Sequence, residues 1–186
     1  MIASAALLIR ERGVEATSFS EVLADSEAPR GSIYHHFPGG KAQLVEEATR
    51  YGGEFIAAGL AAALAEEDPP AAVRRFCQSW RETLTGSDFA AGCPVVSATL
   101  EGERTPAARE AAGAAFERWE GLLMEAFERH GIDPARAASL ATLAITAIEG
   151  AIVVARAQRS SAPLERVTGE LERLTSVALA ETRADR

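Results

Sequence analysis

The sequence has few of the residues on which small secreted domains, metal proteins and all-β proteins depend. It contains two cysteines, and no Cys-x-x-Cys pair or His/Cys ligand spacing surrounds them, so neither a disulfide framework nor a metal site is expected. Aromatic residues make up 6% of the 186 residues, and lysine occurs once. The remainder is rich in Ala, Leu, Glu and Arg and 47% of the chain is hydrophobic. This composition favours helix and excludes both a β-sandwich and a disordered chain.

Signals for export or for a membrane are also weak. No basic segment precedes the first apolar stretch, so we expect no signal peptide and a cytoplasmic protein with reduced thiols at Cys77 and Cys93. Residues 137–155 form the longest apolar run, but Ala and Thr are only weakly apolar and Glu149 interrupts the run. We therefore predict a buried helix at a subunit interface and no membrane contact.

The charge is unevenly distributed. The net charge of −8 argues against a protein that coats nucleic acid without selectivity. Residues 28–41, however, contain Arg30, His35, His36 and Lys41 and no acid at all. A small basic segment on an acidic protein is what a local contact with DNA requires.

Hydrophobic periodicity and capping residues predict an all-α fold of about nine helices. The first is expected over 2–12 and ends at Gly13, and a capping box of Ser18 and Glu21 starts the second. The others are expected from Pro29 to about residue 35, from Lys41, after Asp68-Pro69, over 94–100, from 106 to about 130, from 134 to about 159, and from about 161 onward. In the fourth helix, the three- to four-residue spacing predicts one buried stripe of Leu44, Ala48, Tyr51 and Phe55.

The first three short helices, with a tight turn before the third, are typical of a helix-turn-helix. A recognition helix needs apolar residues that hold it to the core and polar or small residues that face the base edges. Ile33 and Phe37 are four residues apart and can face the core. The outward positions are then Arg30, Ser32, Tyr34 and His35, of which the arginine can contact guanine O6 and N7.

Two helix starts can add phosphate contacts. Lys41 opens the fourth helix, where free N–H groups already favour an anion, and Thr17 and Ser18 stand at the start of the second helix in the same way. We expect His36 to pack against the turn or the first helix, with base contact as the alternative.

The run from Arg30 to Lys41, which reads Arg-Gly-Ser-Ile-Tyr-His-His-Phe-Pro-Gly-Gly-Lys, resembles the DNA-binding motif of the TetR/AcrR family of transcriptional repressors. Gly13 followed by Thr17-Ser18-Phe19 also matches that family's pattern. The resemblance covers about residues 2–50, whereas the second half is similar only in the number and length of its helices. Gly39-Gly40-Lys41 and Gly92-Cys93-Pro94-Val95 look like the LmrA/YxaF-like branch, whose members respond to drugs or flavonoids.

The resemblance implies a homodimer of all-helical subunits that binds a palindromic double-stranded DNA operator and is released by a small hydrophobic or aromatic molecule. It implies a DNA-binding domain over 1–45 and a ligand-binding and dimerisation domain over 46–186. Family members usually carry a polar arm before the first helix, whereas this sequence starts almost at the helix. Either the sequence is truncated at its start, or DNA contacts from such an arm are absent. The positions that match DNA-contacting positions of the family are Thr17, Ser18, Arg30, Ser32, Tyr34, His35 and Lys41.

The residues around an inducer cavity are predicted from helical spacing together with the resemblance. They are Trp80, Phe89, Val96, Leu100, Phe116, Trp119, Leu123 and Glu149. Glu149 is the one charge in residues 137–155, and a buried carboxylate must be paired, protonated or in contact with water. It either lines the cavity and meets a donor on the ligand or pairs with an arginine of a neighbouring helix.

The last two helices are predicted to form the dimer interface. Alanines at 137, 141, 144, 151 and 155 allow close helix approach, and Leu164, Val167, Leu171, Leu174 and Ala178 follow a heptad spacing. The alternative is that the two helices pack together within one chain. No cofactor is expected, and nothing resembles a catalytic acid/base pair or a P-loop, so we predict a regulator rather than an enzyme. The rival hypotheses are a helical small-molecule-binding protein that no longer binds specific DNA and, more remotely, an enzyme with Glu149 as base.

Overall fold

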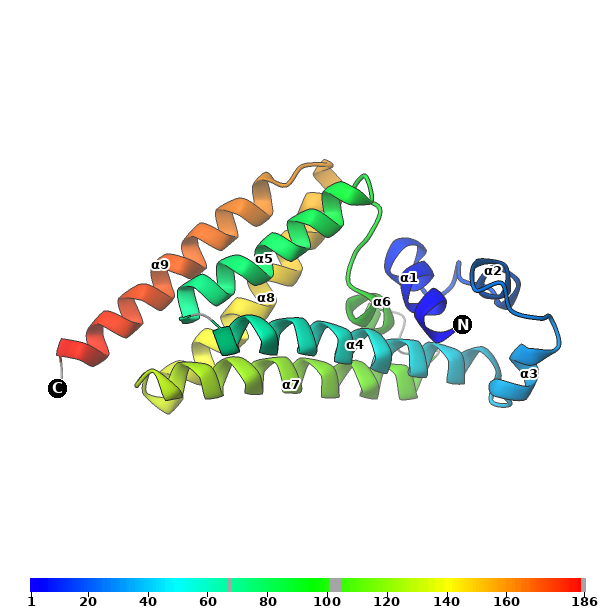
Figure 1. Cartoon of the computed structure of the whole chain (residues 1–186), viewed down its shortest axis with the longest axis horizontal. Helices are drawn as coiled ribbons and strands as arrows, with labels where there is room; N and C mark the ends of the chain where they lie inside the picture. The colour runs from blue at the N-terminus through cyan, green and yellow to red at the C-terminus, as the bar shows by residue number, and fades with distance from the viewer. Residues whose placement is uncertain (67, 101–104, 185–186) are drawn as a thin grey trace. The chain divides into compact units, whose positions relative to one another are not determined.

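The computed structural model describes residues 1–66, 68–100 and 105–184, and within them the chain is helical with no strand, which confirms the predicted all-α class (Figure 1). The helices of this part of the chain are α1 (Ile2–Arg12), α2 (Phe19–Asp25), α3 (Ser32–His36), α4 (Gly40–Glu66), α5 (Pro69–Gly86), α6 (Pro94–Leu100), α7 (Pro106–Arg129), α8 (Pro134–Gln158) and α9 (Ala162–Ala184). Most of their bounds agree with the caps read from the sequence.

The chain divides into two compact units. Unit 1 comprises residues 1–56 and 90–115, and unit 2 comprises residues 57–89 and 116–186. Unit 1 therefore holds α1, α2, α3 and α6 together with one end of α4 and of α7, whereas unit 2 holds α5, α8, α9 and the remainder of α4 and α7. The domain boundary predicted near residue 45 falls inside α4, which runs through both units.

Local capping explains the start of unit 1. Gly13 ends α1 at a φ of 84°, a left-handed value that glycine adopts without strain, and its N–H donates to the carbonyl of Ile9. The predicted capping box is present, since the Ser18 side chain accepts from the Glu21 N–H while the Glu21 carboxylate accepts from the Ser18 N–H. One boundary differs from the prediction: Pro29 lies in the turn before α3, where its carbonyl accepts from the Ser32 N–H.

The core of unit 1 fixes the angle of its helices. Ile9 of α1, Val22 of α2, Ile33 of α3 and Leu44 of α4 are all buried in one cluster. Each of the first four helices therefore contributes at least one large apolar side chain, which is what holds the five-residue α3 in place, because so short a helix is unstable alone.

Two adjacent glycines let α4 approach α6 and α7 closely within unit 1. A Cβ added at Gly52 would lie 2.7 Å from Cγ of Pro94, and one added at Gly53 would lie 2.7 Å from Cβ of Ala115. The predicted buried stripe on α4 is therefore wrong beyond Ala48. Tyr51 and Phe55 are exposed, because the glycine face rather than the aromatic face packs inward.

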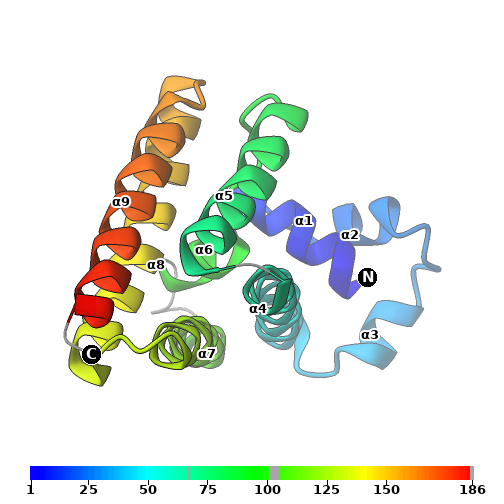
Figure 2. The ribbon, with the colours of Figure 1, turned by 60° about the vertical axis from the view of Figure 1, so that its left-hand side comes forward.

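In unit 2, α5, α8 and α9 pack side by side (Figures 1 and 2). The α8 alanines named above and the heptad positions Leu164, Leu171 and Ala178 are buried within this single chain, while Val167 and Leu174 are half-buried. Exposed ion pairs such as Arg74–Glu172, at 3.3 Å, also join α5 to α9. These buried positions form a seam between helices of one chain, which is the alternative to the predicted dimer interface.

One described helix, α8, is long and apolar enough to cross a membrane by length and composition, and 44% of its most apolar 18-residue window is buried. A buried core helix passes the same test. The α8 helix also leaves Leu143, Val153 and Val154 exposed.

Candidate DNA-binding surface and ligand pocket

The α3 helix presents the exposed face that the sequence predicts. Ile33 is fully buried and Phe37 nearly so, which anchors the helix and turns the intervening positions outward. Tyr34 is 70% exposed, and Arg30 and His35 are exposed as well. The Tyr34 ring lies edge-on to Phe19 of α2, with the ring centroids 5.9 Å apart, so one side of the ring packs against α2. His36 is exposed too, which differs from the expectation that it packs inward.

Three hydroxyls predicted to contact DNA already have partners within the chain, and that of Ser18 donates to Glu21 Oε2 at 2.8 Å. Thr17 is only 3% exposed, and its hydroxyl donates to the carbonyl of Gly13 at 2.8 Å. The Ser32 hydroxyl donates to the carbonyl of Pro29 at 2.6 Å. The single hydroxyl proton of Thr17 is therefore not available to a phosphate. The bond that it makes holds the connection between α1 and α2 instead.

Two cations near the motif are also held internally. The Lys41 ammonium donates to the carbonyl of Glu15 at 3.0 Å, and Arg12 of α1 lies 3.0 Å from the Glu21 carboxylate of α2. Hydrogen bonds from the backbone and side chain of Ser18, assisted by the Arg12 charge, hold the pKa of Glu21 below its ordinary value. These contacts order the α1–α2 corner and the start of α4, and they leave Arg30 as the motif's outward cation without an ion pair among the described residues.

A groove lies between α2 and α3, with a volume of about 490 Å³. Its apolar lining is Phe19, Leu23 and Ala24 of α2, with Ala28 and Ile33. Its polar lining is Ser20, Arg30 and Tyr34. We call this the α2–α3 groove.

The predicted inducer residues divide between the two units. Val96 and Leu100 belong to α6 in unit 1, where Val96 is half-buried and Leu100 is exposed. In unit 2, Trp80, Trp119 and Leu123 are buried, whereas Phe89, Phe116 and Glu149 are partly exposed. The rings of Phe116 and Trp119 meet edge to face, with their centroids 5.1 Å apart.

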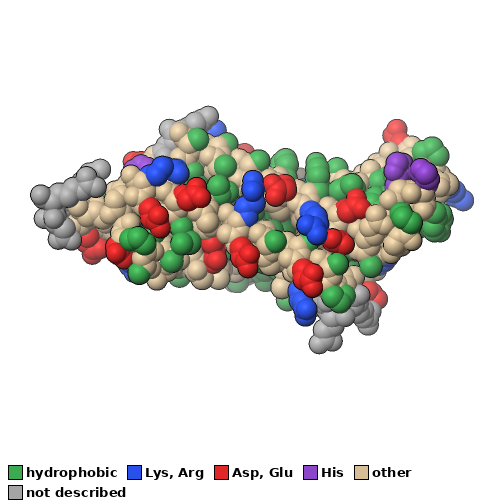
Figure 3. All heavy atoms as spheres, turned by 90° about the horizontal axis from the view of Figure 1, so that it is seen from below, with side chains coloured by type: hydrophobic (Ala, Val, Ile, Leu, Met, Phe, Trp, Pro, Cys, Tyr) green, Lys and Arg blue, Asp and Glu red, His purple; other side chains and the backbone are tan. Residues whose placement is uncertain are grey.

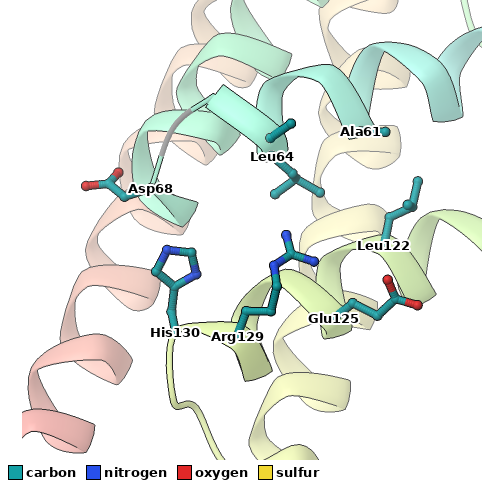
Figure 4. A pocket seen from close by; sticks show the side chains of 8 residues that line it. Ala61, Leu64, Asp68, Leu122, Glu125, Arg129 and His130 are labelled. Atoms are coloured by element: carbon teal, nitrogen blue, oxygen red, sulfur yellow. The ribbon is translucent and has the colours of Figure 1, made fainter.

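Unit 2 contains a pocket of about 630 Å³ whose lining includes none of those predicted residues (Figure 4). It lies between the last turns of α4 and α7 and the start of α5. Figure 4 shows the Arg129 side chain rising toward Leu64, while the Glu125 carboxylate stands to one side. Its lining residues are Ala61, Leu64, Ala65, Asp68, Leu122, Glu125, Arg129 and His130.

Two of these pocket residues also stabilise helix ends. The Asp68 carboxylate accepts from the Ala71 N–H and caps α5, and His130 Nδ1 lies 2.8 Å from the carbonyl of Ala126 in the last turn of α7. The sequence signals at these positions are capping signals, which is why periodicity gave no indication of a pocket there.

Comparison with known proteins places this geometry in a family. Residues 1–48 match the model for bacterial regulatory proteins of the TetR family, and residues 69–170 match the C-terminal domain of LmrA/YxaF-like transcriptional regulators. An HTH-type transcriptional regulator of Mycobacterium tuberculosis is 43% identical over 187 residues, which cover 97% of this chain and 95% of the relative. The chain belongs to the TetR family of bacterial transcriptional regulators.

Other members of the TetR family share its length and fold. LmrA of Bacillus subtilis is 28% identical, with 90% of each chain covered. The solved regulatory protein TetR of Rhodobacter sphaeroides is 25% identical with a TM-score of 0.82, covering 92% of this chain and 95% of that chain. A TetR regulator of Legionella pneumophila, at 24% identity over 93% of this chain and 94% of that chain, has the same fold, with a TM-score of 0.82.

Membership of the TetR family confirms the sequence-based identification, including the LmrA/YxaF-like branch. It makes the protein a DNA-binding transcriptional regulator rather than an enzyme. The acidic and basic side chains on the face shown in Figure 3 are interspersed, with no single large basic patch. For this TetR-family protein, the exposed side of α3 is the candidate DNA-binding surface.

Proposed function

We propose that the protein is a ligand-responsive repressor that binds a palindromic operator as a homodimer in the cytoplasm. The observation that carries the proposal is the exposed surface formed by Arg30 in the turn before α3 and by Tyr34 and His35 of α3. It lies beside the buried Ile33. A short helix anchored by one apolar side chain and outwardly polar can enter a major groove. Lys41 is proposed as a flanking phosphate contact, through the ammonium protons that its bond to Glu15 leaves over, and residues 1–45 as the DNA-binding domain.

The dimer is proposed on the exposed side of α8 and α9. Leu143, Val153 and Val154 of α8 and Val177 of α9 are between 42% and 54% exposed, although each is a large apolar residue. More than half of the most apolar window of α8 is not buried in one chain. A second copy of the chain related by a two-fold axis would cover this surface, and the operator half-sites would then lie about one helical turn, roughly 34–36 Å, apart.

The inducer is proposed to be a small hydrophobic or aromatic molecule bound in the C-terminal part of the chain. The partly exposed Phe116, edge to face with Trp119, offers an aromatic surface, and Glu149 offers an acceptor. The ligand releases DNA if it binds the DNA-incompetent state of the dimer more tightly than the competent state.

Fluorescence anisotropy with duplexes from upstream of the protein's own gene tests this function. We expect binding well above that of a scrambled duplex, weakening as salt rises, with two chains per duplex in sedimentation analysis. The variant Val153→Asp places a charge on the proposed dimer surface and is expected to yield monomers with weakened operator binding. If no natural duplex is preferred over scrambled DNA, the protein is a helical ligand-binding protein and the proposed function is wrong.

A further inference from the structure

The α2–α3 groove carries a feature that phosphate contacts do not explain. Five of its eight lining residues are apolar, and they come from α2, from α3 and, at Ala28, from the turn between them. Arg30 and Tyr34 line the same groove, and both are exposed positions of the DNA-binding motif. An apolar recess therefore lies directly beside the motif's outward guanidinium.

Few cations and few free hydroxyl groups lie around this groove. Arg30 and Lys41 are the only cations in residues 13–41, and the Lys41 ammonium is held by the carbonyl of Glu15. The Ser32 hydroxyl likewise donates within the chain, to the carbonyl of Pro29. Hydrogen bonds to base edges would then come from Arg30 and His35, so an apolar contact would add to the selection among base pairs.

The chemistry of the major groove specifies what an apolar recess can recognise. Base edges there present donors, acceptors and one apolar group, the C5-methyl of thymine. A guanidinium that binds guanine O6 and N7 and an adjoining apolar recess would together read neighbouring base pairs. The Tyr34 ring, edge-on to Phe19, forms one wall of that recess.

We propose that the α2–α3 groove reads a thymine methyl in the operator, beside a guanine contacted by Arg30. This inference rests on the proposed function, because it assigns part of the operator sequence that the DNA-binding surface would select. Tyr34 acts here through its ring, whereas its hydroxyl is free to contact a phosphate.

Thymine-to-uracil replacement tests the proposal directly, because it removes the methyl and keeps every hydrogen-bonding group. The preferred duplex is first obtained by selection from random sequence, and each thymine is then replaced in turn. Burial of one methyl corresponds to about a four-fold change in affinity, or roughly fifteen-fold when both half-sites are altered. We expect one symmetric pair of thymines, next to the guanines read by Arg30, to show this loss.

Three variants assign the effect to the groove. Tyr34→Ala removes the aromatic wall and should reduce the thymine-to-uracil ratio below about two-fold, while Tyr34→Phe should retain it. Phe55→Ala is the matched control, since Phe55 is 72% exposed on α4 and lies outside the groove lining. The ratio compares two duplexes with one protein, so any general loss of affinity cancels.

The outcomes distinguish a failure of the groove assignment from a failure of the proposed function. Specific binding with a methyl effect that Tyr34→Ala abolishes supports the proposal. Specific binding with no thymine sensitive to methyl loss, or with a sensitivity that Tyr34→Ala leaves unchanged, overturns the groove assignment and leaves the proposed function intact. Failure to select any preferred duplex overturns the proposed function, and the groove assignment with it.

Discussion

Replacement of Gly53 by alanine probes the close contact between α4 and α7. The new Cβ would lie 2.7 Å from Cβ of Ala115, about 1 Å nearer than an ordinary carbon contact. Neither atom can move without its backbone, so the helices must separate. Overpacking of this kind costs about 1–3 kcal/mol, against which alanine regains about 1 kcal/mol of helix propensity over glycine.

Gly59 on the same helix supplies the control. A Cβ added there meets no atom within 4 Å, so Gly59→Ala should stabilise the protein by about 1 kcal/mol. The two variants should therefore differ in the free energy of unfolding by about 1–3 kcal/mol. For a chain of this size that corresponds to a Tm difference of roughly 2–12 °C, with Gly53→Ala lower.

Thermal unfolding followed by circular dichroism, at one protein concentration for all variants, measures this difference. If Gly53→Ala raises Tm as much as Gly59→Ala does, α4 and α7 do not make the close contact described, and the account of α4 packing is wrong.

Three further predictions concern charge and titration. If Lys41 of each subunit neutralises one phosphate while Arg30 contacts guanine, log K for the operator should fall with log salt at a slope of about −2, and a slope near −8 would contradict so small a cationic surface. Because the pKa of Glu21 is lowered in the folded protein, the Glu21 carboxylate stabilises the fold at pH values above its ordinary pKa. This stabilisation is lost as the pH falls through the lowered pKa. Glu21→Gln should thus unfold at a lower temperature than the wild type at pH 7 but not at pH 2, and an equal deficit at both pH values would refute this. Burial raises the pKa of the Cys77 thiol to about 11, so the advantage of the wild type over Cys77→Ala in urea unfolding should shrink by about 2–3 kcal/mol between pH 8 and pH 11, whereas a constant advantage would show the thiol to be exposed.

Local signals explain how much of the fold could be predicted from the sequence. Gly13, the Ser18–Glu21 box, Asp68 and Asp133 act on the backbone within three residues or so, and each begins or ends a helix where expected. Such caps depend on little beyond the neighbouring sequence, so they can be read without knowledge of tertiary structure.

Tertiary choices could not be predicted in the same way. Spacing on α4 fits an aromatic stripe as well as a glycine stripe, and only the approach of Pro94 and Ala115 makes the glycine face the buried one. The heptad on α9 likewise specifies an apolar seam but not its partner, which proved to be helices of the same chain. Periodicity reveals that a face is buried, not what buries it.

The candidate site shows the same limit at the level of single side chains. The outward positions of α3 and of the turn before it follow from the anchor at Ile33, so the exposure of Tyr34 and Arg30 could be predicted. The internal hydrogen bond of Thr17 and the tether of Lys41 could not, because both depend on carbonyls made available by the path of the chain between α1 and α2.

The central claim is that the exposed face of α3 selects a DNA sequence, and one ratio tests it most directly. The affinity for the preferred duplex divided by that for scrambled DNA should be measured for the wild type, for Arg30→Ala and for Arg136→Ala, which removes the same charge from the exposed start of α8. The account predicts that Arg30→Ala lowers this ratio by at least about five-fold per half-site, and that Arg136→Ala leaves it unchanged. An Arg30→Ala protein that keeps the wild-type ratio would contradict the account.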